Sequence, residues 1–254
     1  MNVVRRLPEL LGANTRLFVL GVGPAVDRRL VGRMARVGGG AAVTAAREAA
    51  KMGGMGDLIV LRHGETEWSR DGRHTGRTDI PLTPAGEAAA AELKPAVAKL
   101  DVVATFSSPA QRARRTAELA GLPDISIDPD LWEWDYGGYE GRTTKDIQAG
   151  RPGWYLWRDG VIPGDAEHPG ETLEQVGSRA DRVLARVRPL LARGNVALVA
   201  HGHILRVLTA RYLGLPPDGG RLFALGTGTI SSLGTEHGEP VIDSWNVPPA
   251  AWKP

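Results

Sequence analysis

Short apolar runs alternate with helix-like stretches from residue 57 onward. Runs of three to six apolar or β-branched residues bounded by turn residues are typical of buried strands. The strand-like runs are Leu58 to Leu61, Val102 to Phe106, Ile125 to Ile127 and Val196 to Ala200, and a closing hairpin is expected between Thr229 to Leu233 and Pro240 to Ile242. This order of strands and intervening helices predicts a sheet that is mostly parallel.

The helix-like stretches carry recognisable start signals. Thr83 before Pro84 has the pattern of an N-cap followed by proline at the first helical position, and Ser108 with Pro109 repeats it. The expected helices run from Pro84 to about Leu100, from Pro109 to about Leu119, near Thr143 to Gln148, from Thr172 to Leu191 and from Ile204 to Leu213. We therefore predict an α/β fold, a three-layer sandwich with a mostly parallel central sheet and helices on both faces.

The first 56 residues differ from the rest of the chain. They are rich in Ala, Gly and Arg, and they are too few to bury a core of their own. We expect residues 1–56 to be an N-terminal extension that is poorly ordered or follows a wrongly assigned start, with translation beginning at Met52 or Met55, and residues 57–254 to form the domain. A signal peptide around Leu17 to Val26 is the weaker alternative, because the run contains two glycines and no clear cleavage site.

Composition narrows the possible chemistry. The chain has no cysteine, which removes disulfides, thiolate nucleophiles and Cys-ligated zinc, and which fits a cytoplasmic location. Residues 1–52 hold nine Lys and Arg against three Asp and Glu, whereas the remaining 202 residues hold 22 against 26. The basic excess of the whole chain is therefore no argument for nucleic-acid binding, and no apolar run approaches the roughly 20 residues of a membrane span.

Two histidines follow directly after strand-like runs. Arg62, His63 and Gly64 come after the first run, and His201 and His203 come after the run ending at Ala200. The carboxyl ends of parallel strands are where open α/β sheets bind ligands, and the helix after His201 would present its N-terminal amides to an anion. A neutral imidazole can also act as a nucleophile. Arg112, in the first turn of its helix, could place a guanidinium on phosphate oxygens at the same edge.

Five sequence blocks resemble the histidine phosphatase superfamily, also called phosphoglycerate mutase-like. They are RHGETEW (62 to 68), HTGRTDIPLTPAGE (74 to 87), SSPAQRARRTAEL (107 to 119), EWDYGGYEG (133 to 141) and HGH (201 to 203), in the order that the family has. The resemblance implies that His63 is a nucleophile that becomes phosphorylated, that Arg62, Arg112 and His201 bind the phosphoryl group, and that Glu133 is the proton donor.

The residues themselves agree with these roles. Two guanidiniums and a histidine can neutralise a phosphoryl group in transfer without a metal or another cofactor. Glu133 is flanked by aromatic residues that could shield a general acid from water. By resemblance, Thr66, Thr75, Gly76 and Tyr136 shape the substrate site, while His203 supports the pocket and His74 is exposed.

Departures from the mutase pattern favour hydrolysis. Ser69 stands where such mutases have Asn, Thr144 stands where they have Lys, and no arginine pair is evident between Gly150 and Gly170. The blocks most resemble bacterial acid phosphatases and fungal sugar-bisphosphatases. The expected function is metal-independent hydrolysis of small phosphate monoesters, sugar phosphates or similar metabolites, by a monomer or homodimer that binds neither nucleic acid nor membrane.

Three other functions compete with this one. A phosphoglycerate mutase that depends on 2,3-bisphosphoglycerate would use the same residues, and a catalytically silent module could bind a phosphorylated ligand without turnover. Retention of both His63 and Glu133 argues against the silent module, because binding alone needs neither a nucleophile nor a proton donor. A metal-dependent hydrolase built on His63, His201 and His203 is disfavoured, since no Asp or Glu accompanies them at ligand spacing.

Overall fold

The computed structural model describes residues 55–252. The predicted extension over residues 1–56 and the alternative start at Met52 lie outside this range, apart from the last two residues of the extension. Met55 to Pro254 group as one compact unit.

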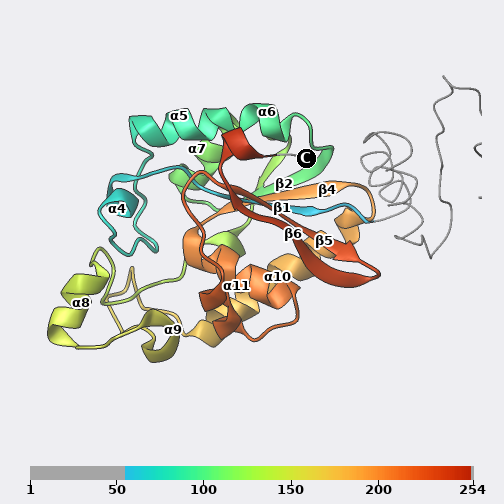
Figure 1. Ribbon diagram of the computed structural model, residues 1–254. Helices are drawn as coiled ribbons and strands as arrows, with labels where there is room; N and C mark the ends of the chain where they lie inside the picture. The colour runs from blue at the N-terminus through green and yellow to red at the C-terminus, as the bar shows by residue number, and fades with distance from the viewer. Residues whose placement is uncertain (1–54, 253–254) are drawn as a thin grey trace, which may run out of the picture. The chain divides into compact units, whose positions relative to one another are not determined.

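A six-stranded sheet in the order β3-β2-β4-β1-β5-β6 forms the centre of the domain (Figure 1). The strands are β1 (Leu58–Arg62), β2 (Val102–Ser107), β3 (Ile125–Ile127), β4 (Asn195–Ala200), β5 (Ile230–Glu236) and β6 (Glu239–Val247). β3, β2, β4 and β1 are parallel, while β5 pairs antiparallel with β1 and β6 pairs antiparallel with β5. The predicted α/β class and mostly parallel sheet are confirmed.

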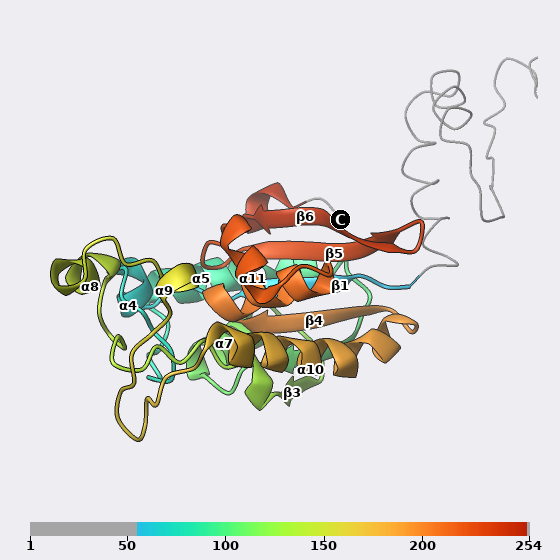
Figure 2. The same cartoon turned by 90° about the horizontal axis from the view of Figure 1, so that it is seen from below.

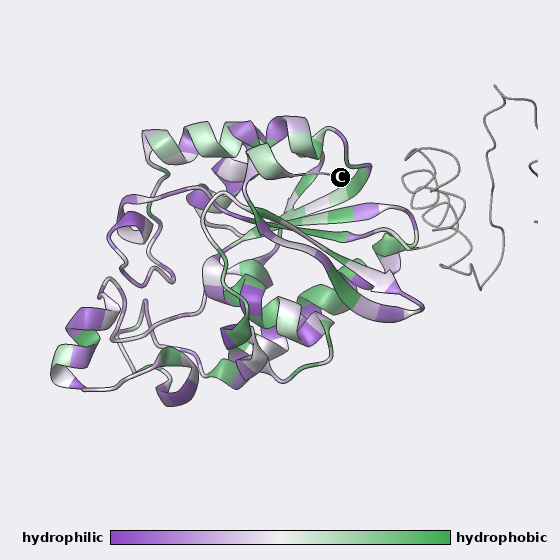
Figure 3. Cartoon of the chain, viewed as in Figure 1, coloured by the Kyte–Doolittle hydropathy of each residue, from purple (hydrophilic) through white to green (hydrophobic). Residues whose placement is uncertain are grey.

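Helices cover both faces of the sheet, as the alternation of elements predicted. One face carries α5 (Pro84–Glu92), α6 (Lys94–Val97) and α7 (Gln111–Leu119), and the other carries α10 (Leu173–Leu191) and α11 (Gly202–Tyr212) (Figures 1 and 2). Alternate residues of the central strands face opposite sides: Leu58 and Val60 belong to the core beneath α10 and α11, whereas Ile59 and Leu61 belong to the core beneath α5 to α7. Figure 3 shows the apolar residues concentrated in these strands and on the helix surfaces that meet them.

Shorter elements lie beyond the end of the sheet where β1 ends. They are α4 (Glu67–Arg70), α8 (Thr144–Gly150) and α9 (Leu156–Asp159), and Figures 1 and 2 both place them at that end. Three short 3-10 helices complete the described chain: η2 (Pro129–Leu131), η3 (Pro217–Leu222) and η4 (Pro249–Ala251). The hydrophobic pattern of the sequence did not predict α4 and α9, because four residues are too few to show a helical period.

Two predicted helix boundaries were wrong. The stretch expected as one helix to Leu100 divides at Leu93 into α5 and α6, and Pro95 explains the break, since it has no N–H to continue the hydrogen-bond ladder of α5. The helix expected from Pro109 begins at Gln111 after Ala110, which makes no side-chain cap. The hydroxyl of Ser108 instead contacts the Ala110 N–H and His201.

Candidate active site

The parallel register brings the ends of three strands together. Arg62 at the end of β1 is opposite Ala200 at the end of β4, and Ser107 at the end of β2 is opposite Val199. The next residue on each strand is His63, His201 or Ser108, and the His63 N–H donates to the Ala200 carbonyl at 3.0 Å. The imidazole rings of His63 and His201 lie 5.0 Å apart between centroids. The predicted convergence at one sheet edge is thus present.

The His63 ring is buried and held in a defined orientation. Its side chain lies 2.7 Å from the Gly64 carbonyl through Nδ1, which assigns the proton to Nδ1 and leaves a lone pair on Nε2. Burial, and then the positive charges of Arg112 and Arg62, hold the pKa of His63 well below its usual 6.5. His63 is therefore neutral at physiological pH and has one nitrogen available for attack.

Arg112 is fully buried and anchored by backbone carbonyl groups. Its Nη1 donates to Thr78 O at 2.9 Å, and its Nη2 donates to Gly76 O at 3.0 Å and to Thr75 O at 3.4 Å. Its Nε donates to His201 Nδ1 at 3.1 Å. Because Nδ1 of His201 accepts, the proton of that ring is on Nε2, which lies 2.7 Å from Ser108 Oγ. That Nε2–H is therefore directed at the Ser108 hydroxyl, and a phosphoryl oxygen would have to replace the hydroxyl to accept from it.

The guanidinium of Arg62 is the second cation at this edge. It donates through Nη1 to the Leu225 carbonyl, while its Nε is buried without a hydrogen-bond partner. Within residues 55–252 neither Arg62 nor Arg112 forms an ion pair, and burial lowers the pKa of both. A buried and a half-buried cation without a carboxylate partner are costly unless an anion joins them. The arrangement is that of an anion site.

Glu133 lies at the N-terminus of α11. Its Oε1 accepts from Ile204 N at 2.8 Å and Trp134 N at 2.9 Å, and its Oε2 accepts from His203 N at 2.9 Å. These three N–H groups fix the position and orientation of the Glu133 side chain. Its charge in turn acts favourably on the guanidiniums of Arg62 and Arg112. The predicted proton donor and phosphate ligands therefore share one electrostatic environment.

Tyr136, His74 and His203 form a cluster of rings beside Glu133. The Tyr136 hydroxyl lies 2.6 Å from His203 Nδ1, and the His74 ring packs edge-on against Tyr136 with centroids 4.8 Å apart. Burial lowers the pKa of His74 and of His203, so both rings are neutral. The expectation that His74 is exposed was wrong: its ring is half-buried, and its Nδ1 lies 2.8 Å from Arg142 O.

The other three predicted substrate residues have backbone contacts of their own. Thr66 caps α4, and its hydroxyl accepts from Ser69 N at 3.1 Å. The Thr75 hydroxyl donates to Arg73 O at 3.2 Å, and the Gly76 N–H donates to the carboxylate of Glu140. Their proposed contact with substrate stays a prediction.

The tryptophans divide between core and site. Trp134, Trp154 and Trp157 are buried in the core that α10 and α11 cover. Trp132 is half-buried and lies parallel to the His201 ring, with centroids 6.4 Å apart. Of these four tryptophans, only Trp132 therefore stacks on His201, a predicted phosphate ligand.

Several contacts at the site were not predicted from the sequence. Thr116 accepts from the Gly64 N–H at 3.0 Å and donates to Arg112 O at 2.7 Å, which ties α7 to the loop that carries His63. Its spacing of four residues from Arg112 is the signal that could have identified it. Ser108 and Glu140 act through backbone and imidazole groups, for which a sequence carries no comparable spacing.

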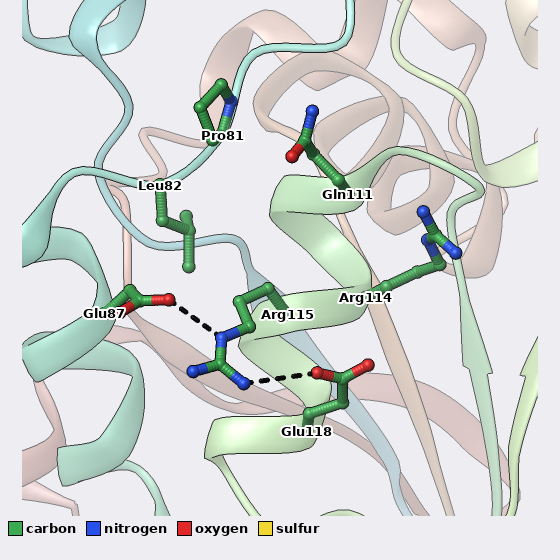
Figure 4. A pocket seen from close by; sticks show the side chains of 7 residues that line it. All are labelled: Pro81, Leu82, Glu87, Gln111, Arg114, Arg115 and Glu118. Carbon is green, nitrogen blue, oxygen red and sulfur yellow. Dashed lines mark hydrogen bonds and ion pairs between the residues drawn. The ribbon is translucent and has the colours of Figure 1, made fainter.

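A cavity of about 310 Å³ lies beside α7, and none of the predicted site residues lines it (Figure 4). Arg115 in its wall is paired with Glu87 at 2.8 Å and with Glu118 at 3.4 Å. Its charge is thereby neutralised, unlike the charges of Arg62 and Arg112. Within residues 55–252 no three His, Asp or Glu side chains are grouped as a metal site would require, and no helix is long and apolar enough to cross a membrane.

The fold is that of an α/β protein whose sheet edge gathers two histidines and two arginines, an arrangement that suits an anion. The sequence model of the histidine phosphatase superfamily (branch 1) matches residues 58–248. This chain belongs to that superfamily, and it is a phosphatase enzyme of the histidine phosphatase type.

Relatives of this chain are named as phosphatases or as a probable phosphoglycerate mutase. An acid phosphatase of Mycobacterium tuberculosis is 40% identical over 71% of this chain and 87% of its own length. A sedoheptulose 1,7-bisphosphatase of Saccharomyces cerevisiae is 35% identical over 62% of this chain and 67% of its own, and a probable phosphoglycerate mutase, GpmB, of Salmonella choleraesuis is 31% identical over 76% and 91%. The solved structure of an open reading frame from Mycobacterium tuberculosis aligns with a TM-score of 0.71 at 36% identity, covering 76% of this chain and 98% of the other.

The depressed histidine pKa values predict acid-sensitive stability. As pH falls below about 6.5, the unfolded chain binds protons on His63 and His201, whereas the folded chain keeps both neutral because burial lowers their pKa. The contribution of each buried histidine to the free energy of unfolding is fully present above pH 6.5. Below pH 6.5 this contribution falls by about 1.4 kcal/mol per pH unit. Thermal unfolding of the ligand-free protein should show Tm falling between pH 7.5 and 5.5. A Tm that rises on acidification in that window would contradict these neutral, buried rings.

Proposed function

We propose that this protein hydrolyses small phosphate monoesters, sugar phosphates among them, through a phosphohistidine on His63 and without a metal. One observation carries the proposal: the guanidiniums of Arg62, which is half-buried, and of Arg112, which is buried, have no carboxylate partner in the described chain and lie beside a neutral histidine with a free Nε2. A phosphoryl dianion would complete the charge of this site.

In the first step, Nε2 of His63 attacks phosphorus as the bond from phosphorus to the leaving oxygen breaks. Arg62 and Arg112 stabilise the charge on the equatorial oxygens, and His201 joins them when a phosphoryl oxygen replaces Ser108 Oγ as the acceptor of its Nε2–H. Glu133 gives its proton to the leaving oxygen, which departs as an alcohol.

In the second step, water attacks phosphorus and the bond from phosphorus to Nε2 breaks. Glu133, now a carboxylate, takes the proton from the water, and inorganic phosphate leaves. The three N–H groups that face Glu133 stabilise the carboxylate that this step needs. One carboxyl group thus serves both half-reactions.

The ring cluster of His74, Tyr136 and His203 supports a hydroxyl-bearing leaving group. Both histidines are uncharged, and with Tyr136 they present hydrogen-bonding and aromatic groups beside Glu133. Sugars suit neutral polar and aromatic walls of this kind. The names of the acid phosphatase and sedoheptulose 1,7-bisphosphatase relatives agree with this class of substrate.

The chain contains no cysteine, and residues 53–254 hold 22 Lys and Arg against 26 Asp and Glu. We therefore propose that the enzyme works in the cytoplasm on a dissolved metabolite, as a monomer or homodimer. Gel filtration with light scattering would measure the oligomeric state directly.

The experiment that tests the function is phosphate release in excess chelator. The substrate panel is nitrophenyl phosphate, sugar mono- and bisphosphates and 3-phosphoglycerate, with conversion of the last to 2-phosphoglycerate followed in parallel. We expect release from sugar phosphates without isomerisation. Isomerisation would make the protein a mutase, and binding of phosphate without release or isomerisation would make it a silent module.

A further inference from the structure

Glu140 has no role in the proposed mechanism, yet its carboxylate accepts from two N–H groups of the loop that holds Arg112. Its Oε1 and Oε2 accept from the Gly76 N–H at 2.9 and 3.0 Å, and Oε1 also accepts from the Thr78 N–H at 3.1 Å. The carboxylate is half-buried, at the end of the segment that begins with Glu133. It therefore fixes the backbone of residues 76 to 78.

The same two residues hold Arg112 through their carbonyl groups. Gly76 O accepts from Nη2 at 3.0 Å and Thr78 O accepts from Nη1 at 2.9 Å. The carboxylate of Glu140 thus binds the N–H groups of a short loop whose C=O groups orient the guanidinium. A displacement of this loop would turn or shift Arg112.

Gly76 shows how closely Glu140 approaches the loop. A Cβ added at Gly76 would lie 2.7 Å from Glu140 Oε2 and 2.7 Å from the Trp134 carbonyl, which no real Cβ tolerates. The Trp134 carbonyl, which cannot move aside as a side chain can, therefore requires glycine here, a reason different from the substrate contact that the sequence suggested.

The charges of Glu140 and Arg112 also fit such a link. Arg112 is fully buried. The negative charge of Glu140 is one of those that favour the charged form of the Arg112 guanidinium. Burial itself raises the pKa of Glu140, whereas the N–H and hydroxyl groups of residues 76 and 78 oppose that rise. The loop and the carboxylate therefore stabilise each other.

We propose that Glu140 is a positioning residue for the phosphate site: it holds residues 76 to 78 so that Arg112 meets the phosphoryl group in one orientation. The inference rests on the proposed function, in which Arg112 binds phosphate. It assigns no chemistry to Glu140, which acts through the loop.

The substitution Glu140→Gln tests this role, because glutamine keeps the shape but turns an NH2 group toward an N–H donor. We expect kcat/KM to fall about 10- to 100-fold, the range for groups that orient a ligand-binding residue. The loss should be equal for nitrophenyl and sugar phosphates, since Arg112 contacts the phosphoryl group and not the leaving group. The Kd for orthovanadate, measured by calorimetry without turnover, should rise by a similar factor.

The matched control is Glu118→Gln, an exposed carboxyl on α7 that is paired with Arg115. It should keep wild-type kinetics and vanadate affinity. Glu140→Asp is the second variant, because it retains the charge but is one methylene shorter, and it should weaken vanadate binding in the same direction even if the glutamine variant does not fold.

Vanadate affinity within twofold of wild type in the folded variants would overturn the positioning role, as would a loss that depends on the leaving group. Failure of the proposed function is distinguishable, because it would appear in the wild-type protein as vanadate binding without phosphate release.

Discussion

The variant His63→Ala is expected to lose turnover by about 10⁴-fold or more, because the nitrogen that accepts the phosphoryl group is removed. The ring that it replaces is buried, neutral and oriented by Gly64. Arg62 and Arg112 remain in the variant, so it should still bind inorganic phosphate. Steady-state phosphate release and phosphate titration by calorimetry measure the two effects separately.

The control for this variant is His237→Asn, at an exposed turn position between β5 and β6 with a positive φ that asparagine tolerates. It should keep wild-type kcat. Residual activity of His63→Ala within tenfold of wild type would be incompatible with a covalent step at this residue.

The variant Glu133→Gln is expected to separate substrates by their leaving groups. A sugar alkoxide needs a proton as it departs, whereas nitrophenolate is stable without one. The value of kcat/KM should therefore fall about 10²- to 10⁴-fold for sugar phosphates and much less for nitrophenyl phosphate. Because kcat/KM includes only the steps up to transfer onto His63, it reads the acid role without the later hydrolysis.

The comparison variant is Glu167→Gln, an exposed carboxyl outside the site. It should leave both substrates at wild-type rates. Equal losses for the two substrates in Glu133→Gln would mean that the carboxyl group serves the site in some way other than proton transfer to the leaving group.

The positions of Arg62, His63 and His201 were predictable because each follows an apolar run. Parallel strands place their carboxyl ends at one edge, so a sequence that ends two strands with histidine already specifies a pair of neighbouring rings. Arg112 was predictable for a related reason, since the first turn of the helix after β2 returns to that edge.

The contacts of Glu133 were not predictable from its neighbours. The aromatic residues around it suggested shielding from water, and Trp134 and Tyr136 are indeed buried. Its oxygens nevertheless meet the N–H groups at the start of α11, about 70 positions along the chain. Only the tertiary arrangement brings that helix end to the carboxylate.

Most of the site contacts that the sequence did not predict are made to backbone groups. Glu140 binds N–H groups and Arg112 binds C=O groups of the same loop, and every residue type except proline supplies both groups. Ser108 resembled a helix cap because its pattern with Pro109 is the same in either role, although its hydroxyl contacts His201. Side-chain identity alone cannot distinguish these partners.

The central claim is a phosphohistidine at His63, and trapping it is the most direct test. Enzyme mixed with a sugar phosphate is quenched in alkali within milliseconds and analysed by peptide mass spectrometry, in wild type and in His63→Ala. The account predicts a phosphate-sized mass increase on His63 that is stable in base, is lost in acid and is missing from the variant. Rapid phosphate release with no modified His63 at any quench time would contradict it.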